Sequence, residues 1–305
     1  MRDQISDSEI LRLLPPVLRA RGYYLYLDSG RRLCDFWQLG GAAILGHKPP
    51  SVVTELKNYA ERGLFAPLPH HTEGRFLKAL GKLFPAKNGL QYKFRIYSDK
   101  HSMFKALENA GFEANNIPDP AFPHDSNAES NSEKNNAIKK PVSIWRPFLG
   151  SANFESQIYL PVLPWSLSPP VLVLEDLVQD KSVQNDSVQN ESVQEESPDK
   201  KLRPGDLVSP VILAGAARAV YDLIAAADNG QRPRFARVEK ALAASGKFQK
   251  QGIYITPRPG AGVDWIDLWK HFLENGFLLP PDPAEPLILP GVLSPGEEAK
   301  LAELL

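Results

Sequence analysis

Histidine and arginine side chains are the first residues of this sequence whose type and spacing could do chemistry. His70 and His71 are adjacent, and imidazole is a common metal ligand. Adjacent residues of an extended chain point to opposite sides, and no carboxylate or cysteine at ligand spacing completes the set, so no metal is expected. Arg146 and Arg258 each stand next to proline. Each is either a contact for an anionic ligand or an exposed surface residue.

The familiar motifs of hydrolases and nucleotide-binding enzymes do not occur in the sequence. It contains no G-x-S-x-G elbow, no P-loop and no H-E-x-x-H pair. The single cysteine, Cys34, excludes a disulfide within the chain, and no cysteine spacing suggests zinc.

Composition and charge exclude further classes of protein. The chain has 305 residues, with 35 Lys and Arg against 36 Asp and Glu, so it carries no basic footprint for nucleic acid. The N-terminus has acids before its apolar residues, which argues against a secretory signal and for a cytoplasmic protein. The most apolar long segment, Val208 to Ala227, contains Pro210, Arg218 and Asp222, so we expect a buried helix and no membrane span.

Short aliphatic runs and amphipathic stretches predict the elements that must position any site. The predicted strands are Tyr92–Tyr97, Ile158–Leu163 and Val171–Leu174, and the predicted helices are Thr72–Phe84, Val211–Ala227, Phe235–Ala244 and Val263–Glu274. Strands that are apolar throughout are typical of a parallel sheet covered by helices on both faces. Ser294-Pro295-Gly296-Glu297 predicts a capping box at the start of a last helix. The sequence therefore predicts an α/β fold with a mainly parallel sheet.

The beginning of the chain predicts a second, antiparallel structure. Tyr23–Leu27 and Arg32–Trp37 read as two strands joined by a turn that contains Gly30. We therefore expect a small α+β domain built from residues 1–50 and 235–305, beside a large domain of residues 51–234.

Two segments of the large domain are low in complexity. Residues 125–140 are almost entirely Ser, Asn, Glu and Lys, and residues 180–201 contain the five-residue repeat SVQND, SVQNE, SVQEE. Such segments bury too little apolar surface to offset the entropy of ordering, so both are predicted to be solvated loops without catalytic residues.

Several motifs together resemble the class III aminotransferases, which depend on pyridoxal phosphate (PLP). The stretch from Gly22 to Val53 reads G-Y-Y-L-Y-L-D-S-G, then D-F, then L-G-H-K-P-P, in the order and spacing that is typical of the start of that family. Residues 265–305 resemble the small-domain end of glutamate-1-semialdehyde aminomutases in the same class. Ser209-Pro210 and the alanine-rich run after it resemble the family's Asn-Pro helix. The resemblance covers roughly residues 19–110 and 205–305, with a short patch at 171–179. It implies a reduced large domain of the PLP-transferase type I fold.

The resemblance also implies roles for individual residues. PLP needs an acid at its ring nitrogen and donors around its phosphate. Asp176, at the end of a predicted strand, matches the ring-nitrogen partner, although it also reads as a carboxylate at the surface. The family's phosphate-binding turn matches residues 98–102, beginning at Ser98, but its glycine is replaced by Asp99. That carboxylate would repel a phosphate by roughly 4 kcal/mol at 4 Å and an effective dielectric of 20.

The lysine that should form the Schiff base with PLP has no clear counterpart. The family's catalytic segment precedes the Asn-Pro helix, but here no lysine occurs between Lys201 and Lys247. Lys200 and Lys201 are the remaining candidates, although they lie at the end of the second low-complexity segment and read more readily as solvated surface lysines.

These observations lead to one expectation and one alternative. We expect a shortened, degenerate class III aminotransferase without PLP that has a binding or scaffolding role, as a homodimer or paired with a complete aminotransferase homologue. The alternative is an active PLP-dependent aminotransferase or aminomutase acting on an amino acid or amino-aldehyde, with Asp176 at the ring nitrogen and an unrecognised lysine.

Overall fold

The computed structural model describes residues 7–86, 89–114, 117–122, 140–150, 156–177, 198–229 and 234–305. Most of the two predicted low-complexity loops, residues 125–139 and 180–197, lies outside these ranges. The helices are α1 (Asp7–Leu11), α2 (Pro50–Ala60), α3 (Thr72–Leu83), α4 (Lys100–Asn109), α5 (Pro198–Lys201), α6 (Pro210–Asp228), α7 (Ala236–Ser245), α8 (Trp265–Glu274) and α9 (Pro295–Leu304). The strands are β1 (Val17–Arg21), β2 (Tyr24–Leu27), β3 (Arg32–Asp35), β4 (Leu90–Ile96), β5 (Lys140–Trp145), β6 (Ser156–Pro161), β7 (Val171–Leu177), β8 (Phe248–Gln251), β9 (Tyr254–Pro257), β10 (Phe277–Leu278) and β11 (Leu287–Ile288).

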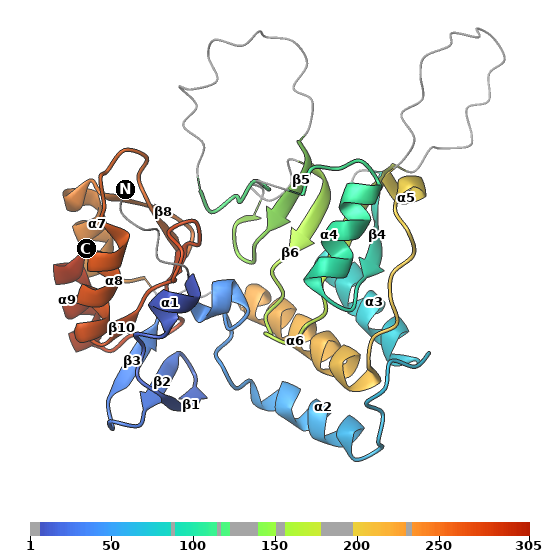
Figure 1. Cartoon of the computed structure of the whole chain (residues 1–305), viewed down its shortest axis with the longest axis horizontal. Coiled ribbons are helices and arrows are strands. Elements are labelled where there is room, and N and C mark those ends of the chain that lie inside the picture. Colours follow the sequence, from blue (N-terminus) through green and yellow to red (C-terminus); the bar gives the residue numbers. More distant parts are fainter. Residues whose placement is uncertain are drawn as a thin grey trace, which may run out of the picture.

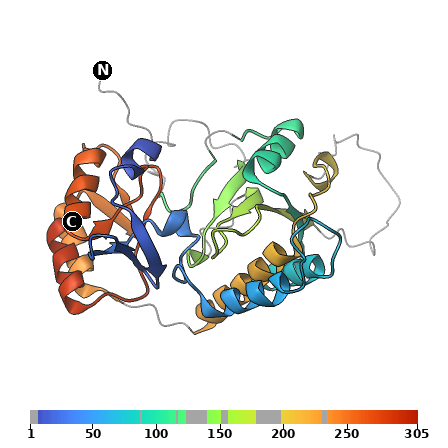
Figure 2. The ribbon, with the colours of Figure 1, turned by 60° about the horizontal axis from the view of Figure 1, so that its bottom comes forward.

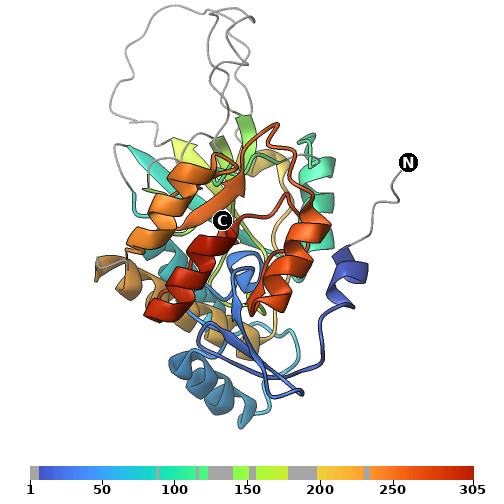
Figure 3. The ribbon, with the colours of Figure 1, turned by 90° about the vertical axis from the view of Figure 1, so that its left-hand side faces the viewer.

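Both ends of the described chain form one unit, which we call the terminal unit (Figures 1 and 3). It contains the sheet β1-β2-β3-β10, the sheet β11-β9-β8 and helices α1, α7, α8 and α9. The predicted hairpin is present as antiparallel β2 and β3, and the predicted capping box is present at Ser294. Strand β10 pairs in parallel with β3, so the two ends share a sheet.

The remaining elements form the central unit, whose layers are seen in Figure 2. Its sheet has the order β4-β7-β6-β5. Helices α3 and α6 cover one face, α2 packs on α6, and α4 covers the other face. Successive residues of β7 alternate between these layers: Val171 and Val173 contact the α3–α6 side, and Leu172 and Leu174 contact the α4 side.

The fold class is α/β as predicted, but this sheet is mixed. Among the described strands, β5 pairs in parallel with β6, whereas β6 with β7 and β4 with β7 are antiparallel. The physical reason is that a continuous aliphatic run indicates only that a strand is covered by helices on both faces. A parallel and a mixed sheet can both be covered in this way. The expectation of a mainly parallel sheet is therefore corrected.

Helix α6 confirms the buried helix that the sequence predicts between Val208 and Ala227. It is long and apolar enough to span a membrane by length and composition, but 56% of its most apolar window is buried inside the protein. It packs against both α2 and α3. Its Gly215 is in close contact with neighbouring side chains, because a Cβ there would lie 2.9 Å from the ring of Trp165.

Candidate functional site

The turn from Ser98 to Ser102 begins helix α4, and the polar groups of Ser98, Asp99 and Ser102 are bonded within the chain. Asp99 is the N-cap, and its Oδ1 accepts the N–H of Ser102 at 2.7 Å. This hydrogen bond lowers the pKa of Asp99. The N–H of Ser98 donates to Asp206 Oδ2 at 3.0 Å. A helix N-terminus attracts anions through its unpaired N–H groups, and here two carboxylates of the chain itself lie at that end.

Asp206 reaches this place because its backbone packs against the end of β4. Its N–H donates to the carbonyl of Ile96 at 2.7 Å. Glycine is needed beside it, since a Cβ on Gly205 would lie 2.3 Å from that carbonyl oxygen. Arg203 donates to Asp206 Oδ1 at 2.7 Å, and this bond is the main cause of the lowered pKa of Asp206. The carboxylate beside α4 is therefore charged at neutral pH.

Asp176 and the start of α4 lie at opposite ends of the strand pair β4–β7. Asp176 pairs in register with Gln91 near the beginning of β4, whereas Ser98 follows the end of that strand. At about 3.3 Å per residue, the strand between them spans roughly 20 Å. Asp176 also has a partner, Lys93 Nζ at 3.1 Å. The structure therefore does not bring Asp176 and Ser98 into one site.

The candidate lysines lie nearer to Asp176, on the short helix α5. Both Lys200 and Lys201 are exposed. Their neighbour Asp199 bonds Lys93 Nζ at 2.9 Å and also pairs with Arg95. The bonds from Asp199 and Asp176 raise the pKa of Lys93. Lys93 is therefore held as an ammonium ion, which is the form that does not attack an aldehyde.

The described residues do not fit PLP at the start of α4. The charge of Asp206 adds to that of Asp99 where a phosphate dianion would bind. Asp176 is too far away to hold the ring of a cofactor whose phosphate lay at Ser98. Asp176 and Ser98, which the sequence assigned to one cofactor, thus belong to two separate networks of polar contacts, one around Lys93 and one around Asp206.

The histidine pair forms part of a surface ring cluster. The rings of His70 and His71 lie 3.9 Å apart, and His70 Nδ1 is 3.1 Å from the hydroxyl of Thr72. Within the part of the chain that the structure describes, no group of three or more His, Cys, Asp and Glu residues could hold a metal ion.

Arg146 lies at the junction of the two units and is only 4% exposed. Its Nε donates to the Asp119 carboxylate at 2.7 and 2.9 Å, and its Nη1 donates to the carbonyl of Gly40 at 2.9 Å. The guanidinium also lies over the ring of Tyr254, at 5.4 Å from its centroid. Arg146 therefore joins the central unit to the terminal unit. Arg258 is exposed, and its Nε donates to the carbonyl of Phe248 at 3.0 Å.

The turn around Gly40, whose carbonyl accepts the hydrogen bond from Arg146, has an unusual backbone. Residues Gln38 to Gly41 all have positive φ, between 47° and 109°. Gly41 has no alternative there, because a Cβ would also lie 2.9 Å from Val162 Cγ1. Gln38 is fully buried, and its Nε2 donates to the carbonyl of Ile288 at 3.0 Å.

Asp35 and His47 hold this turn, and they belong to the D-F and L-G-H motifs that carry the family resemblance. Asp35 Oδ1 accepts the N–H groups of Trp37 and Gln38 at 2.8 and 2.9 Å. Its Oδ2 lies 2.7 Å from His47 Nε2. The motif residues are thus explained by the turn that they build, and no reacting group is needed to account for them.

Glu285 is a second acidic residue of the Arg146 junction, beside Asp119. Trp37 Nε1 donates to its Oε2 at 2.5 Å. Burial raises the pKa of Glu285, although the Trp37 bond and the nearby Arg146 oppose that shift. Asp119, Asp206 and Glu285 are not predicted from the sequence as functional residues. The contacts of Arg146 with Asp119, Ser98 with Asp206 and Trp37 with Glu285 each join residues at least 27 positions apart, for which a single sequence carries no local signal.

Comparison with curated proteins gives partial sequence matches. No family model matches the chain. An uncharacterized protein of Treponema pallidum is 42% identical over 80 residues, which is 26% of each chain. A glutamate-1-semialdehyde 2,1-aminomutase of Pyrobaculum arsenaticum is 38% identical over 84 residues, or 27% of this chain and 20% of the enzyme. The matches thus span a fifth to a quarter of these relatives' length.

Comparison with solved structures extends over nearly the whole chain. The ornithine delta-aminotransferase of Plasmodium falciparum matches with a TM-score of 0.56 and 15% identity, covering 98% of this chain and 97% of that one. This chain has the aminotransferase fold. An omega-transaminase from Sphaerobacter thermophilus (TM-score 0.58, 12% identity, 99% and 97% covered) has the same fold. So does the acetylornithine aminotransferase from Elizabethkingia anophelis (0.56, 13%, 98% and 97%). With the aminomutase match, these structures support the resemblance to class III aminotransferases.

Proposed function

We propose that this chain is a catalytically degenerate protein of the class III aminotransferase fold, with a binding or scaffolding role and without bound PLP. The observation that carries the proposal is the start of α4, where Asp206 and Asp99 accept the N–H groups of Ser98 and Ser102 and place two carboxylates where a phosphate would bind. The separation of Asp176 from that helix start supports it. So does the charged state of Lys93, the described amine that pairs with Asp176.

A PLP titration tests this proposal directly. The purified protein is titrated with PLP, its absorbance is followed into the near-visible range, and the mixture is then reduced with borohydride. We expect no new absorbance band beyond that of free PLP and no cofactor fixed at one defined lysine. A known aminotransferase treated in parallel shows that the conditions detect a bound cofactor.

The alternative function, an active PLP-dependent aminotransferase or aminomutase, predicts the opposite result. One lysine would be labelled stoichiometrically, and mass spectrometry of peptides would identify it. Lys200→Gln and Lys201→Gln variants would show whether either of these candidates is responsible. Labelling of one lysine with transfer of an amino group from an amino acid would overturn the proposed function.

We further propose that the protein is a cytoplasmic homodimer. Apolar side chains that are exposed in the single chain support an association: Phe65 is 63%, Leu68 is 53% and Leu207 is 50% exposed. Phe65 and Leu207 adjoin a direct contact, since Ser209 Oγ donates to the carbonyl of Leu64 at 3.3 Å. Sedimentation equilibrium should give twice the mass of the chain, and a Phe65→Ser, Leu68→Ser variant should give a lower mass. A monomer that co-purifies with a longer aminotransferase would instead identify the partner as a complete homologue.

A further inference from the structure

Strand β1 is an outer strand of its sheet, and most of its side chains are exposed (Figure 1). Among the described strands it pairs only with β2, so no strand lies along its other edge. Leu18 on this strand is 71% exposed and Val17 is 41% exposed. An unpaired strand edge is a template on which a segment of another chain can add as a further strand.

One face of this sheet carries arginine and tyrosine side chains. Because residues directly opposite on paired strands share a face, Arg19, Tyr26 and Arg32 form one row across β1, β2 and β3. Arg21 lies opposite Tyr24 in the next row of the same face. The guanidinium of Arg19 lies over the ring of Tyr26, at 4.3 Å from its centroid. Stacking of this kind orders a guanidinium and leaves its N–H groups available to a carboxylate.

Arg32 shows what an arginine binds on this face. Its Nη2 lies 3.0 Å from Oε1 of Glu297 in α9, and Glu297 also accepts the hydroxyl of Tyr24 at 3.0 Å. Arg19 and Arg21 are both exposed, and neither has a carboxylate partner within the part of the chain that the structure describes. The β1 edge of this face is therefore basic and complementary to acidic side chains.

A second copy of β1 does not fit this edge. Two antiparallel copies centred on Ala20 would place the Arg19 side chains opposite the Arg21 side chains, and like charges directly opposite are destabilising. Charged residues on an edge strand prevent pairing of this kind. On the other face of the sheet, Val17 lies opposite Leu27, which is only 3% exposed. The edge therefore favours a strand that is acidic on one face and apolar on the other.

We propose that an extended acidic peptide segment of a partner protein binds along β1 as an added strand. Successive side chains of a strand alternate between its faces, so acids two positions apart both reach the arginine face and pair with Arg19 and Arg21. The residues that alternate with these acids are aliphatic and lie on the side of Val17. The proposal rests on the proposed binding role and names the chemistry of its partner. Its test uses no PLP, so its failure is distinguishable from a failure of the PLP titration.

Fluorescence anisotropy of labelled peptides, titrated with the full chain, tests the proposal. The peptide TVEVEVT has two acids two positions apart and should bind with a Kd of about 0.1 mM or tighter. TVQVQVT lacks the charges, and TVVEEVT has the same composition with adjacent acids, which point to opposite faces. Each should bind at least about tenfold more weakly, the loss expected for one charged hydrogen bond. No binding of TVEVEVT at about 1 mM protein, or equal binding of TVVEEVT, would overturn the proposal.

Backbone methylation separates an added strand from a purely electrostatic contact. Successive N–H groups of a strand point to opposite edges, so the N–H groups of the two glutamates in TVEVEVT lie on one edge and those of the valines on the other. Methylation of the edge that faces β1 should weaken binding at least about tenfold, whereas methylation of the other edge should not. Equal affinity of the two methylated peptides would overturn the proposal. So would tighter binding of a single-stranded oligonucleotide than of TVEVEVT.

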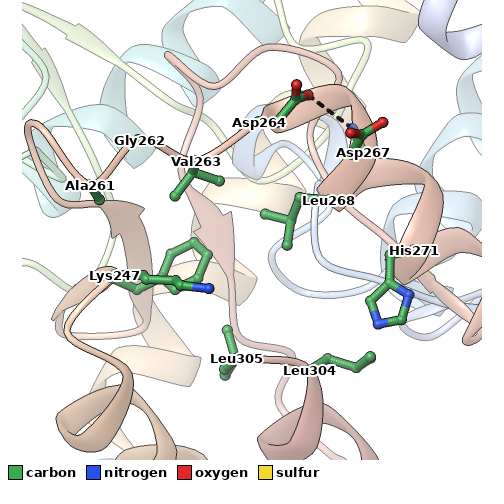
Figure 4. A pocket seen from close by; sticks show the side chains of 11 residues that line it. Lys247, Ala261, Gly262, Val263, Asp264, Asp267, Leu268, His271, Leu304 and Leu305 are labelled. Atoms are coloured by element: carbon green, nitrogen blue, oxygen red, sulfur yellow. Dashed lines mark hydrogen bonds between the residues drawn. The ribbon is translucent and has the colours of Figure 1, made fainter.

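Matched variants locate the site. Arg19→Gln and Arg21→Gln should each weaken binding of TVEVEVT about tenfold, since each removes one charged contact. Lys247→Gln removes the same charge elsewhere on the terminal unit, from a pocket of about 290 Å³ that Asp264 and Asp267 also line (Figure 4). It should bind the peptide as the unaltered protein does. Thermal unfolding checks that all three variants are folded, and equal affinity in all three would overturn the proposal.

Discussion

Arg146 illustrates how a polar residue that could meet an anionic ligand can instead be part of the framework. From the sequence alone, Arg146 is interpreted either as a contact for an anionic ligand or as an exposed side chain. In the structure its guanidinium is buried and bonded to Asp119 and to the Gly40 carbonyl. A buried charge is retained only where its partner and its hydrogen bonds are all in place.

Arg146→Met should therefore destabilise the protein strongly. It leaves the Asp119 carboxylate buried without its partner, and breaking a buried pair in this way costs about 3 to 5 kcal/mol. The free energy of unfolding from urea denaturation measures the effect. Arg258→Met, at an exposed arginine with one carbonyl contact, serves as control and should cost about 1 kcal/mol or less.

Adding Asp119→Asn to the Arg146→Met variant removes the unpaired charge. The double variant should then be less destabilised than the sum of the two single variants, because the residues interact directly. Additive effects would show that Arg146 stabilises the protein through packing and not through its ion pair.

The second prediction at the residue scale is a pH dependence at Asp206. Its pKa is lowered below the ordinary value of about 3.9, chiefly by Arg203. A lowered pKa in the folded state stabilises the protein above about pH 4, and this contribution is lost as the pH falls through the lowered pKa. The difference in unfolding free energy between the unaltered protein and Asp206→Asn should therefore be largest at pH 5 to 7 and shrink below pH 4. Arg203→Met should weaken the same dependence, and a difference that is unchanged at pH 3 would contradict this assignment.

At the scale of elements, the sequence predicted the helices and turns whose characteristic pattern lies within one short stretch of chain. Helices α3, α6, α7 and α8 follow their apolar spacing, and the Ser294 capping box and the β2–β3 hairpin have short sequence signatures. Strand direction has no such signature. Strands β4 and β7 read as apolar in either direction, and only the pairing of distant segments makes them antiparallel.

The same limit explains the candidate site. Ser98 and Asp99 were found because they lie on one turn, but Asp206 joins them across 108 positions of sequence. Its approach depends on Gly205, whose role is visible only once the Ile96 carbonyl is placed beside it. A single sequence marks Gly205 only as a turn residue.

Gly205→Ala should separate the Asp206 segment from β4. The new Cβ would lie 2.3 Å from a backbone oxygen, which cannot rotate away as a side chain can. Such overpacking costs about 1 to 3 kcal/mol, measured by chemical denaturation. Gly81→Ala in α3 is the matched control, because no atom lies within 4 Å of its Cβ position. It should stabilise the protein by about 0.5 to 1 kcal/mol through helix propensity. Equal effects of the two substitutions would mean that Gly205 does not determine the position of Asp206.

At the scale of the whole molecule, the contact between the two units resembles a core. Tyr254 and Ile288 lie on strands of the terminal unit, yet both pack in the apolar cluster that contains the central sheet and α6. Tyr254 also donates its hydroxyl to the carbonyl of Pro147 at 2.9 Å. Units joined through a loose polar surface move independently, whereas an apolar, hydrogen-bonded contact holds them in one arrangement.

The two units should therefore unfold together, and Ile288→Ala should weaken both of them. Ile288 is fully buried, so its truncation leaves a cavity and costs about 2 to 5 kcal/mol. Calorimetry of the unaltered protein should give one transition, which the variant shifts to lower temperature as a whole or divides into two. Val292→Ala, at a side chain that is 65% exposed, should leave the transition unchanged within about 0.5 kcal/mol. Two transitions in the unaltered protein would show that the shared cluster does not couple the units, because cooperative unfolding requires contacts that neither unit can lose alone.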